Sequence, residues 1–411
     1  MSLNSNMTEC LEEILERNYC EIIDDDITDT VLDYVEKEND IINKDVIFVK
    51  RLTKVAYNLI KKQVNGSKEV NISDKILNKL CDFNIIGILM VEESKDLTPL
   101  NANTLEAHFF AYAGDMVELQ YKKSGDIKLA KRAFNMFKSA SDKSKDVESI
   151  HHAVNLSKAT QMARISYNQD FNFMPLNDLI DMMVNAGDAI LEFNSISAGL
   201  NYEMASYYFE KKYCQSNDIK DLENSFKFIK KSAEIVEDID KLKSANRQSF
   251  TANRAKDLAN LSKNYDQRLD WAVKWFDHKL KSAHLSKQAG DNFYAAKAFS
   301  FASDPAKILS KMTRDLYWFD KAIEVKRIGA EMSENIDHIF SSQEYMFTGS
   351  LADARNRIEE DPESMQIAID CCTKYIKFCY KYSDCNTNFI GRATDIVNNC
   401  ARKLLKYDSV E

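Results

Sequence analysis

One sixteen-residue pattern occurs six times in this chain and constrains its fold more than any other feature. The clearest copy is residues 315–330, DLYWFDKAIEVKRIGA. Counted from Asp315 as position 0, it has an apolar residue at +4, a core pair at +7 and +8, and small residues at +14 and +15. The copies begin at Asp126, Asn172, Asp218, Arg268, Asp315 and Asp361, at spacings of 46, 46, 50, 47 and 46 residues. A period of this length is typical of a solenoid of stacked helical repeats.

A further small residue lies thirteen positions before each copy. These residues are Ala113, Ala159, Ala205, Ala255, Ala302 and Thr348. Small side chains at −13, +14 and +15 predict that adjacent helices approach closely there, because larger side chains would hold them apart. Each repeat is therefore predicted to have a first helix of about 20 residues, a polar turn and a second helix. The low content of turn formers, 10 Gly and 4 Pro in 411 residues, also favours long helices.

Residues 104–384 resemble the tetratricopeptide-repeat (TPR) class, which has paired antiparallel helices, small residues at helix crossings and aromatic residues between them. The period here averages 47 residues rather than 34, and the W-x₂-L-G-x₂-Y signature is absent. The resemblance implies an all-α fold: a TPR-like superhelix, an α-solenoid of about six antiparallel helix pairs. The last copy has bulky Tyr375 and Ile376 at its small positions, as expected of a terminal repeat.

Residues 385–411 are predicted to form a C-terminal capping helix over that last pair. Its covering side chains would be Ile390, Ile396, Val397, Leu404 and Leu405.

Residues 1–43 are predicted to form acidic N-terminal helices. They contain thirteen acidic and two basic residues, whereas the rest of the chain is close to neutral. The apolar stripe of Leu11, Ile14, Leu15 and Ile22 is expected to pack on a helix over residues 44–64. Both a solvated end cap and a partner-docking arm agree with this composition.

Residues 44–103 allow two interpretations. The stripe of the first helix comprises Val46, Phe48, Val49, Leu52, Val55, Ala56 and Leu59. The order of this helix, the short segment Val70-Asn71-Ile72, a helix over 73–84 and the run IIGILMV resembles a winged helix, which implies DNA contact through the basic surplus between Lys44 and Lys79. In the other interpretation, an α-rich segment begins the core of the solenoid.

Side-chain patterns for chemistry are missing from the sequence. GxGxxG, GxxxxGK[ST] and GxSxG do not occur, so we expect no catalytic and no cofactor-binding residues. On a helix His151 and His152 point about 100° apart, and His278 and His284 also diverge, so no metal site is predicted. Aromatic and thiol clusters are interpreted as core: Trp271, Trp275, Phe276, Trp318 and Phe319, and Cys371, Cys372, Cys379, Cys385 and Cys400.

The expected location is cytoplasmic, and no membrane partner is expected. The apolar run at residues 85–91 is too short to span a bilayer, and glutamates occupy the positions of a signal sequence's apolar core. Nine cysteines without a CxxC motif suit a reducing compartment.

The leading functional hypothesis is a non-catalytic scaffold or adaptor for protein–protein interaction, without a cofactor. Its partner would be a protein or peptide ligand in the solenoid groove, formed by the first helices of the repeats. The alternative is a regulatory DNA-binding protein with a winged-helix-like segment at 44–100 and a TPR-like sensor. The near-neutral body argues against a general nucleic-acid binder. The partner-binding residues and the oligomeric state are left open.

Overall fold

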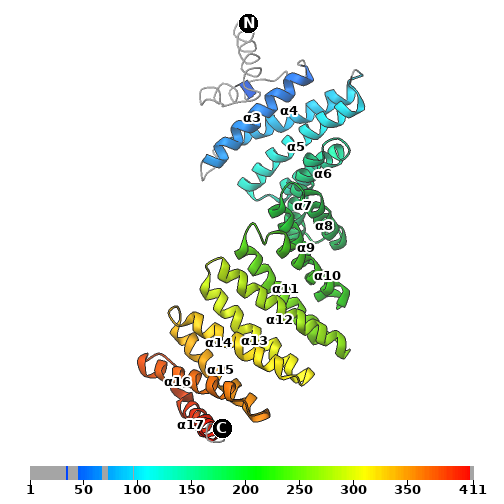
Figure 1. Cartoon of the computed structure of the whole chain (residues 1–411). Coiled ribbons are helices and arrows are strands. Elements are labelled where there is room, and N and C mark those ends of the chain that lie inside the picture. The colour runs from blue at the N-terminus through cyan, green and yellow to red at the C-terminus, as the bar shows by residue number, and fades with distance from the viewer. Residues whose placement is uncertain (1–33, 36–44, 67–72, 96, 408–411) are drawn as a thin grey trace. The chain divides into compact units, whose positions relative to one another are not determined.

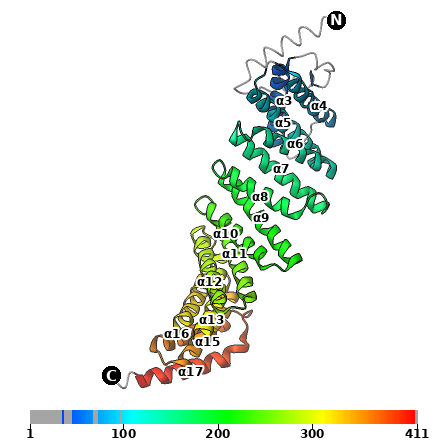
Figure 2. The same ribbon diagram turned by 90° about the vertical axis from the view of Figure 1, so that its right-hand side faces the viewer.

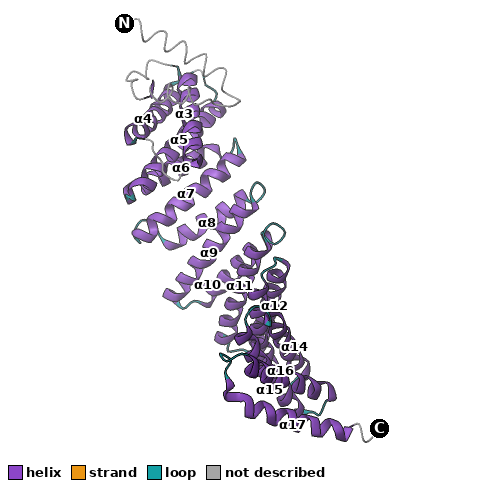
Figure 3. Ribbon diagram, turned by 90° about the vertical axis from the view of Figure 1, so that its left-hand side faces the viewer, coloured by secondary structure: helices purple, strands orange, loops and turns teal. Residues whose placement is uncertain are grey.

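The fold is all-α, as the repeat pattern predicts. The computed structural model describes residues 34–35, 45–66, 73–95 and 97–407, and these contain helices and no strand (Figure 3). Figure 1 labels the helices: α3 (Val46–Gly66), α4 (Asp74–Glu93), α5 (Pro99–Ser124), α6 (Ile127–Ser144), α7 (Ser149–Gln169), α8 (Leu176–Ile190), α9 (Ser195–Ser216), α10 (Ile219–Ile235), α11 (Lys241–Leu261), α12 (Tyr265–Gln288), α13 (Asn292–Thr313), α14 (Leu316–Ser333), α15 (His338–Ile358), α16 (Pro362–Lys381), the 3₁₀ turn η2 (Thr387–Phe389) and α17 (Ile390–Tyr407).

Helices α5 to α16 form the six predicted pairs of a TPR-like α-solenoid. We call the odd-numbered helices α5 to α15 the first helices and the even-numbered helices α6 to α16 the second helices. The chain divides into two compact units at the Asn201–Tyr202 bond, inside α9. From α3 to α8 and from α10 to α17, helices that are consecutive in the chain pack side by side. Hydrogen bonds between Ser206 and Ser225 join α9 to α10.

Position 0 of the repeat pattern is the N-cap of the second helix in four of the six copies. The side chains of Asp126, Asp218, Asp315 and Asp361 each accept a hydrogen bond from a backbone amide two or three residues later. Such a side chain satisfies an amide that has no partner within the helix. In the other two copies the pattern start is displaced: α8 begins at Leu176, and α12 is capped by Asn264, four residues before Arg268.

The predicted close crossings are present. Ala113, Ala159, Ala205, Ala255, Ala302 and Thr348 are all fully buried. At +15, where side chains are small, the backbone carbonyl is reached from the next first helix. Ser244 donates to the carbonyl of Ala233 at 2.9 Å, and Ser341 donates to that of Ala330 at 2.8 Å. The small residues therefore allow both close packing and a hydrogen bond between helices.

Polar side chains 43 or 44 residues apart join successive first helices. In the first unit, Lys158 of α7 lies 2.5 Å from Asp115 of α5. In the second unit, Arg247 of α11 lies 2.7 Å from Glu203 of α9, and Arg254 contacts Glu210. The Arg247 side chain is only 4% exposed, so its pairing with Glu203 is required to compensate for its burial. Successive first helices are thus neighbours in one layer.

The winged-helix interpretation of residues 44–103 is wrong for the part that the structure describes. The run at 85–91, expected as the wing, lies inside helix α4. Its buried residues Leu77, Leu80, Cys81, Ile88 and Val91 follow the 3.6-residue period of a helix, and Asn84 and Gly87 complete the same face. The uninterrupted apolar run concealed this period. Val70-Asn71-Ile72 lies outside the described residues.

The apolar stripe that is predicted to dock on the helix of 44–64 also lies outside the described residues. It comprises Leu11, Ile14, Leu15 and Ile22. The adjoining Tyr34 and Val35 are buried. The ring of Tyr34 meets Phe48 of α3 edge-on, with 6.4 Å between ring centroids. Tyr34 therefore packs on the helix of 44–64, while the docking of the predicted stripe stays a prediction.

The aromatic and thiol clusters are core, as interpreted from the sequence. Trp275 and Phe276 are buried. Trp271 is partly buried against the core cluster that contains Trp275, and Trp318 against the one that contains Phe276. Phe319 is partly buried against the cluster that contains Ile323. All five clustered cysteines are buried. Burial raises the pKa of Cys371 and of Cys372 to about 12, so both thiols stay protonated at neutral pH.

Helix α17 packs against α15 and α16, as predicted for a capping helix (Figure 2). Ile396 is buried, and Ile390, Val397 and Leu404 are partly buried against the same core. Leu405 is an exception at 69% exposed, because it lies on the outer side of α17.

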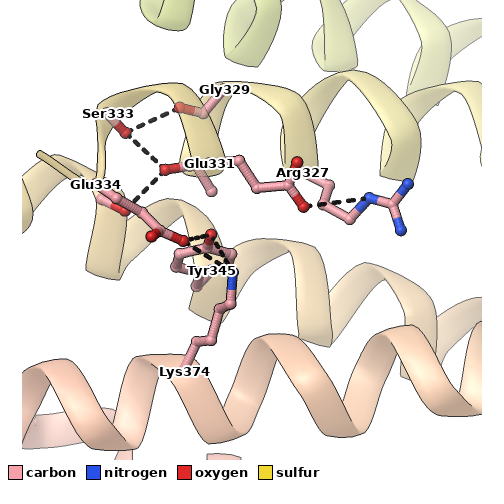
Figure 4. A network of polar contacts seen from close by, with 9 residues as sticks. Arg327, Gly329, Glu331, Ser333, Glu334, Tyr345 and Lys374 are labelled. Atoms are coloured by element: carbon pink, nitrogen blue, oxygen red, sulfur yellow. Dashed lines mark hydrogen bonds and ion pairs between the residues drawn. The ribbon is translucent and has the colours of Figure 1, made fainter.

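A polar cluster joins α14, α15 and α16 (Figure 4). Glu334 accepts hydrogen bonds from Tyr345 and from Lys374, the latter at 2.8 Å, and the Lys374 ammonium also lies 2.8 Å from the Tyr345 hydroxyl. Burial raises the pKa of Tyr345, and the Glu334 carboxylate raises it further. Burial alone would raise the pKa of Glu334, but the two hydrogen bonds outweigh it and lower that pKa below its ordinary value of 4.5.

The close crossing of α13 and α14 gives a first prediction. A Cβ at Gly329 would lie 2.7 Å from the backbone oxygen of Ala296, whereas a Cβ at Gly391 of α17 would meet nothing within 4 Å. Gly329→Ala should lower the free energy of unfolding by about 1–2 kcal/mol, despite the better helix propensity of Ala. Gly391→Ala should leave it unchanged or raise it slightly. Urea denaturation measures both, and equal stability of the two variants would contradict the packing.

The cluster around Glu334 gives a second prediction, on pH. Because the pKa of Glu334 is lowered in the fold, its contribution to stability is present above pH 4.5 and is lost as the pH falls below that value. Lys374→Met removes a cause of the lowering, so the urea midpoint should fall less between about pH 6 and about pH 3.5 than in the wild type. The exposed Lys377→Met on the same helix is the control, and an identical pH dependence in all three proteins would contradict this account.

Candidate functional site

Exposed large apolar side chains concentrate on the first helices. Among the described residues of α5 to α16, fourteen lie on first helices and four on second helices. The fourteen are Leu100, Ile150, Val154, Ile196, Leu200, Tyr207, Leu242, Phe250, Leu261, Tyr294, Phe301, Ile339, Phe347 and Ile358. The four are Ile219, Tyr265, Tyr317 and Tyr380. A concentration of exposed apolar side chains on one set of helices is typical of an interaction site.

Four of the five aromatic members of this surface lie on three successive first helices of the second unit, and the fifth, Tyr207, lies on α9. We call Phe250, Tyr294, Phe301 and Phe347 the aromatic row; each is between 50% and 58% exposed. Phe301 and Phe347 occupy the same repeat position, directly before the small residue at −13. Ser300 of α13 hydrogen-bonds to Glu344 of α15, which places the two helices in contact beside these phenylalanines.

A small cavity lies beside Phe347. Its volume is about 100 Å³, and it lies between α15 and the segment formed by η2 and α17. Met346, Phe347 and Tyr375 line it, together with Phe389 and Arg392. This is room for one apolar side chain, with a guanidinium among the lining groups.

A buried ion pair supports the aromatic row from below. Lys326 of α14 lies 2.7 Å from Glu344 of α15, and their side chains are only 11% and 7% exposed. The Lys326 ammonium also donates to Ser300 at 2.9 Å and lies 5.4 Å from the centroid of the Phe347 ring. Three helices are thereby fixed beneath Phe301 and Phe347, so the row is carried by a rigid base.

The first helices that carry the aromatic row have a positive net charge. Helices α11, α13 and α15 contain ten basic and four acidic residues, a net charge of +6. Helices α10, α12, α14 and α16 contain fifteen basic and eleven acidic residues, a net charge of +4. The layer that bears the aromatic row therefore has few acidic side chains.

A larger cavity of about 450 Å³ lies between α14 and α16, in the other layer. Its lining is mainly charged, and those charges are largely paired. Lys321 lies 2.7 Å from Glu324, and Asp320 lies 3.2 Å from Arg355. A surface of satisfied ion pairs offers little to a ligand, so we assign the candidate site to the aromatic row and the small cavity beside it.

The histidine pairs considered in the sequence diverge as expected. The imidazole of His152 faces Ser141, with 2.9 Å between Nδ1 and the Ser141 Oγ, whereas His151 faces His108 of α5. His278 hydrogen-bonds to Gln248, and His284 meets the ring of Phe299 edge-on. The contact between His108 and His151 is not predicted from the sequence, because the two residues lie 43 positions apart on different helices.

Comparisons with known proteins find matches among solved structures alone, at low sequence identity. No family model matches the chain, and no curated protein matches it. Among solved structures, a circular tandem repeat protein with novel repeat topology matches 98% of this chain and 93% of its own, with 14% identity and a TM-score of 0.30. The nuclear import adaptor Nro1 of S. pombe matches 79% and 99%, with 8% identity and a TM-score of 0.30. A STAND ATPase with a tetratricopeptide repeat sensor from Pyrococcus horikoshii matches 97% and 65%, with 13% identity and a TM-score of 0.23.

None of the helices in the described ranges has the length and apolar character needed to cross a membrane.

Proposed function

We propose that this protein is a non-catalytic interaction scaffold whose second unit binds an acidic peptide segment with apolar anchor residues. The observation that carries the proposal is the aromatic row, which is exposed on the first helices and rests on a buried ion pair. Aromatic side chains contribute much of the binding energy at protein interfaces, and helical repeats present such side chains on one layer.

The chemistry of the partner follows from the surface. An apolar side chain of the partner would enter the cavity beside Phe347, and other apolar side chains would cover the aromatic row. Acidic residues flanking these anchors would meet helices α11, α13 and α15, whose net charge of +6 would accelerate association and select against basic segments. A cytoplasmic location and the absence of catalysis belong to this proposal.

The alternative, a DNA-binding regulator, has less support. Its winged helix is replaced by helix α4 in the described residues, and no described element offers a wing. Aromatic side chains within a basic layer could also stack on single-stranded nucleic acid, so a nucleic-acid competitor is part of the test.

The test is selection of peptides from a displayed library of random 15-residue segments against the full-length protein. We expect selected peptides to combine apolar residues with Asp or Glu. Their affinity should fall at least about tenfold in Phe301→Ser/Phe347→Ser, because two aromatic side chains that the bound peptide would cover are lost. Tyr317→Ser/Tyr380→Ser, on second helices and at least as exposed, is the matched control.

Two outcomes would contradict the proposal. One is a peptide set whose affinity is the same in both double variants. The other is displacement of the peptides by a single-stranded oligonucleotide that itself binds more tightly, which would favour nucleic-acid binding. Unchanged circular dichroism in the variants confirms that the loss is local.

A further inference from the structure

Two histidines and a glutamate of the first unit face one another across α5 and α7. His108 Nε2 lies 3.1 Å from His151 Nδ1 and 3.4 Å from the Oε2 atom of Glu148. Glu148 and His151 are also in direct contact, and the three ligand atoms all lie within 4.8 Å of one another. We propose that His108, Glu148 and His151 form a binding site for a divalent transition-metal ion such as Zn²⁺.

Two of the three separations between the ligand atoms suit a metal ion, and the third, between Glu148 and His151, is shorter and would have to lengthen on binding. Two ligand atoms at about 2.0–2.1 Å from a tetrahedral zinc ion lie about 3.3 Å from each other. The two separations measured from His108 Nε2 bracket that value. Two imidazoles and one carboxylate are a common ligand set for zinc and for other first-row transition metals, whereas Mg²⁺ and Ca²⁺ prefer oxygen ligands.

Local structure explains why the three side chains meet. Glu148 is the N-cap residue of α7, yet its carboxylate caps none of the helix amides, although an acidic side chain there commonly does. It instead contacts His151, three residues later on the same side of the first helical turn. His108 comes from the neighbouring first helix α5, and its ring packs against Tyr112, with 6.3 Å between centroids.

The surroundings set the chemistry of the site. The side chain of His108 is 19% exposed, that of Glu148 is 32% exposed, and that of His151 is 45% exposed, so the site is open on the His151 side. Burial lowers the pKa of His108 to about 4, and Lys50 of α3 acts in the same direction, so this imidazole is neutral at pH 7. Lys50 and Lys54 would also repel a cation, and we therefore expect weaker binding than at zinc sites with several anionic ligands.

Three protein ligands leave a fourth coordination position. Water or a side chain from another molecule would fill it, on the exposed side near His151. The metal ion would also join α5 to α7, and thereby stabilise the packing between two successive repeats. The sequence predicts no metal site because the histidine pairs within one helix diverge, whereas the proposed site is formed by residues of two repeats.

The test is a Zn²⁺ titration of the chelator-stripped full-length protein, in competition with a chromogenic chelator. We expect one ion per chain at this site. His108→Ala, His151→Ala and Glu148→Gln should each weaken its affinity at least about tenfold, because even residues that only orient metal ligands contribute that much. His152→Ala, the next residue in the same helical turn, should bind as the wild type does. Lys50→Gln should bind more tightly, which a merely structural role for the cluster does not predict.

Two further measurements separate this site from the cysteines and from unfolding. Co²⁺ in place of Zn²⁺ should give a visible spectrum without thiolate charge-transfer absorption. Zn²⁺ should raise the melting temperature of the wild type and of His152→Ala, but not that of His151→Ala, whose side chain is nearly half exposed and whose loss should leave the fold intact.

The proposal is overturned if no ion binds, if His108→Ala and His151→Ala bind as the wild type does, or if the Co²⁺ spectrum shows thiolate ligation. The site lies in the first unit and the aromatic row in the second, so either proposal can fail while the other holds.

Discussion

Close helix crossings at the small residues of each repeat are the constraint on which the rest of the structure depends. A side chain no larger than alanine or serine at +14 and +15 lets the next first helix come near enough for its serine to reach the backbone carbonyl at +15. At Gly329 even a methyl group would meet the backbone of α13. Close packing and a buried hydrogen bond thus occur at the same place at Ala233 and Ala330, and repeating the small residues every 46 to 50 residues produces a solenoid rather than a globular bundle.

Ion pairs between successive first helices are a second constraint, and they explain which side chains of this layer face outward. Successive first helices are joined by ion pairs at 43- or 44-residue spacing, such as Lys158 with Asp115 and Arg247 with Glu203. These pairs take up polar side chains between the helices. The outward positions of the same helices then carry the aromatic row, which no contact within a single repeat requires. A layer held together by charges and faced with aromatic residues can bind a partner without altering its own core.

The sequence predicts the fold well because the repeat pattern records burial directly. Position 0 predicts the start of the second helix, and in the structure Asp126, Asp218, Asp315 and Asp361 are N-caps that each accept a backbone hydrogen bond. The prediction fails where local chemistry competes. At the copy that starts at Arg268, the helix begins about one turn earlier than the pattern predicts, because Asn264 caps α12. In the run at 85–91, exposed apolar residues such as Leu89 obscure the helical period of the buried ones.

Both candidate sites depend on the register between repeats, which a single-repeat pattern does not contain. Phe301 and Phe347 share a repeat position, so the sequence shows that they are equivalent, but it does not show that they are exposed. Their exposure follows only once α13 and α15 are placed side by side. His108 and His151 differ in repeat position, and only the contact of α5 with α7 brings their imidazoles together. Spacing rules for metal ligands describe sites within one turn or one loop, and therefore do not detect a pair of this kind.

The last repeat shows how a departure from the pattern can create a binding feature. Tyr375 occupies the +14 position that is small elsewhere, and its large ring is buried there. Its hydroxyl instead donates to the backbone oxygen of Asn386, in the segment that leads to α17. The hydrogen bond across this crossing is thus reversed: the second helix supplies the side chain and the following segment supplies the carbonyl. The cavity beside Phe347 is lined by that same Tyr375. The bulky residue at this position therefore also lines the pocket at the end of the aromatic row.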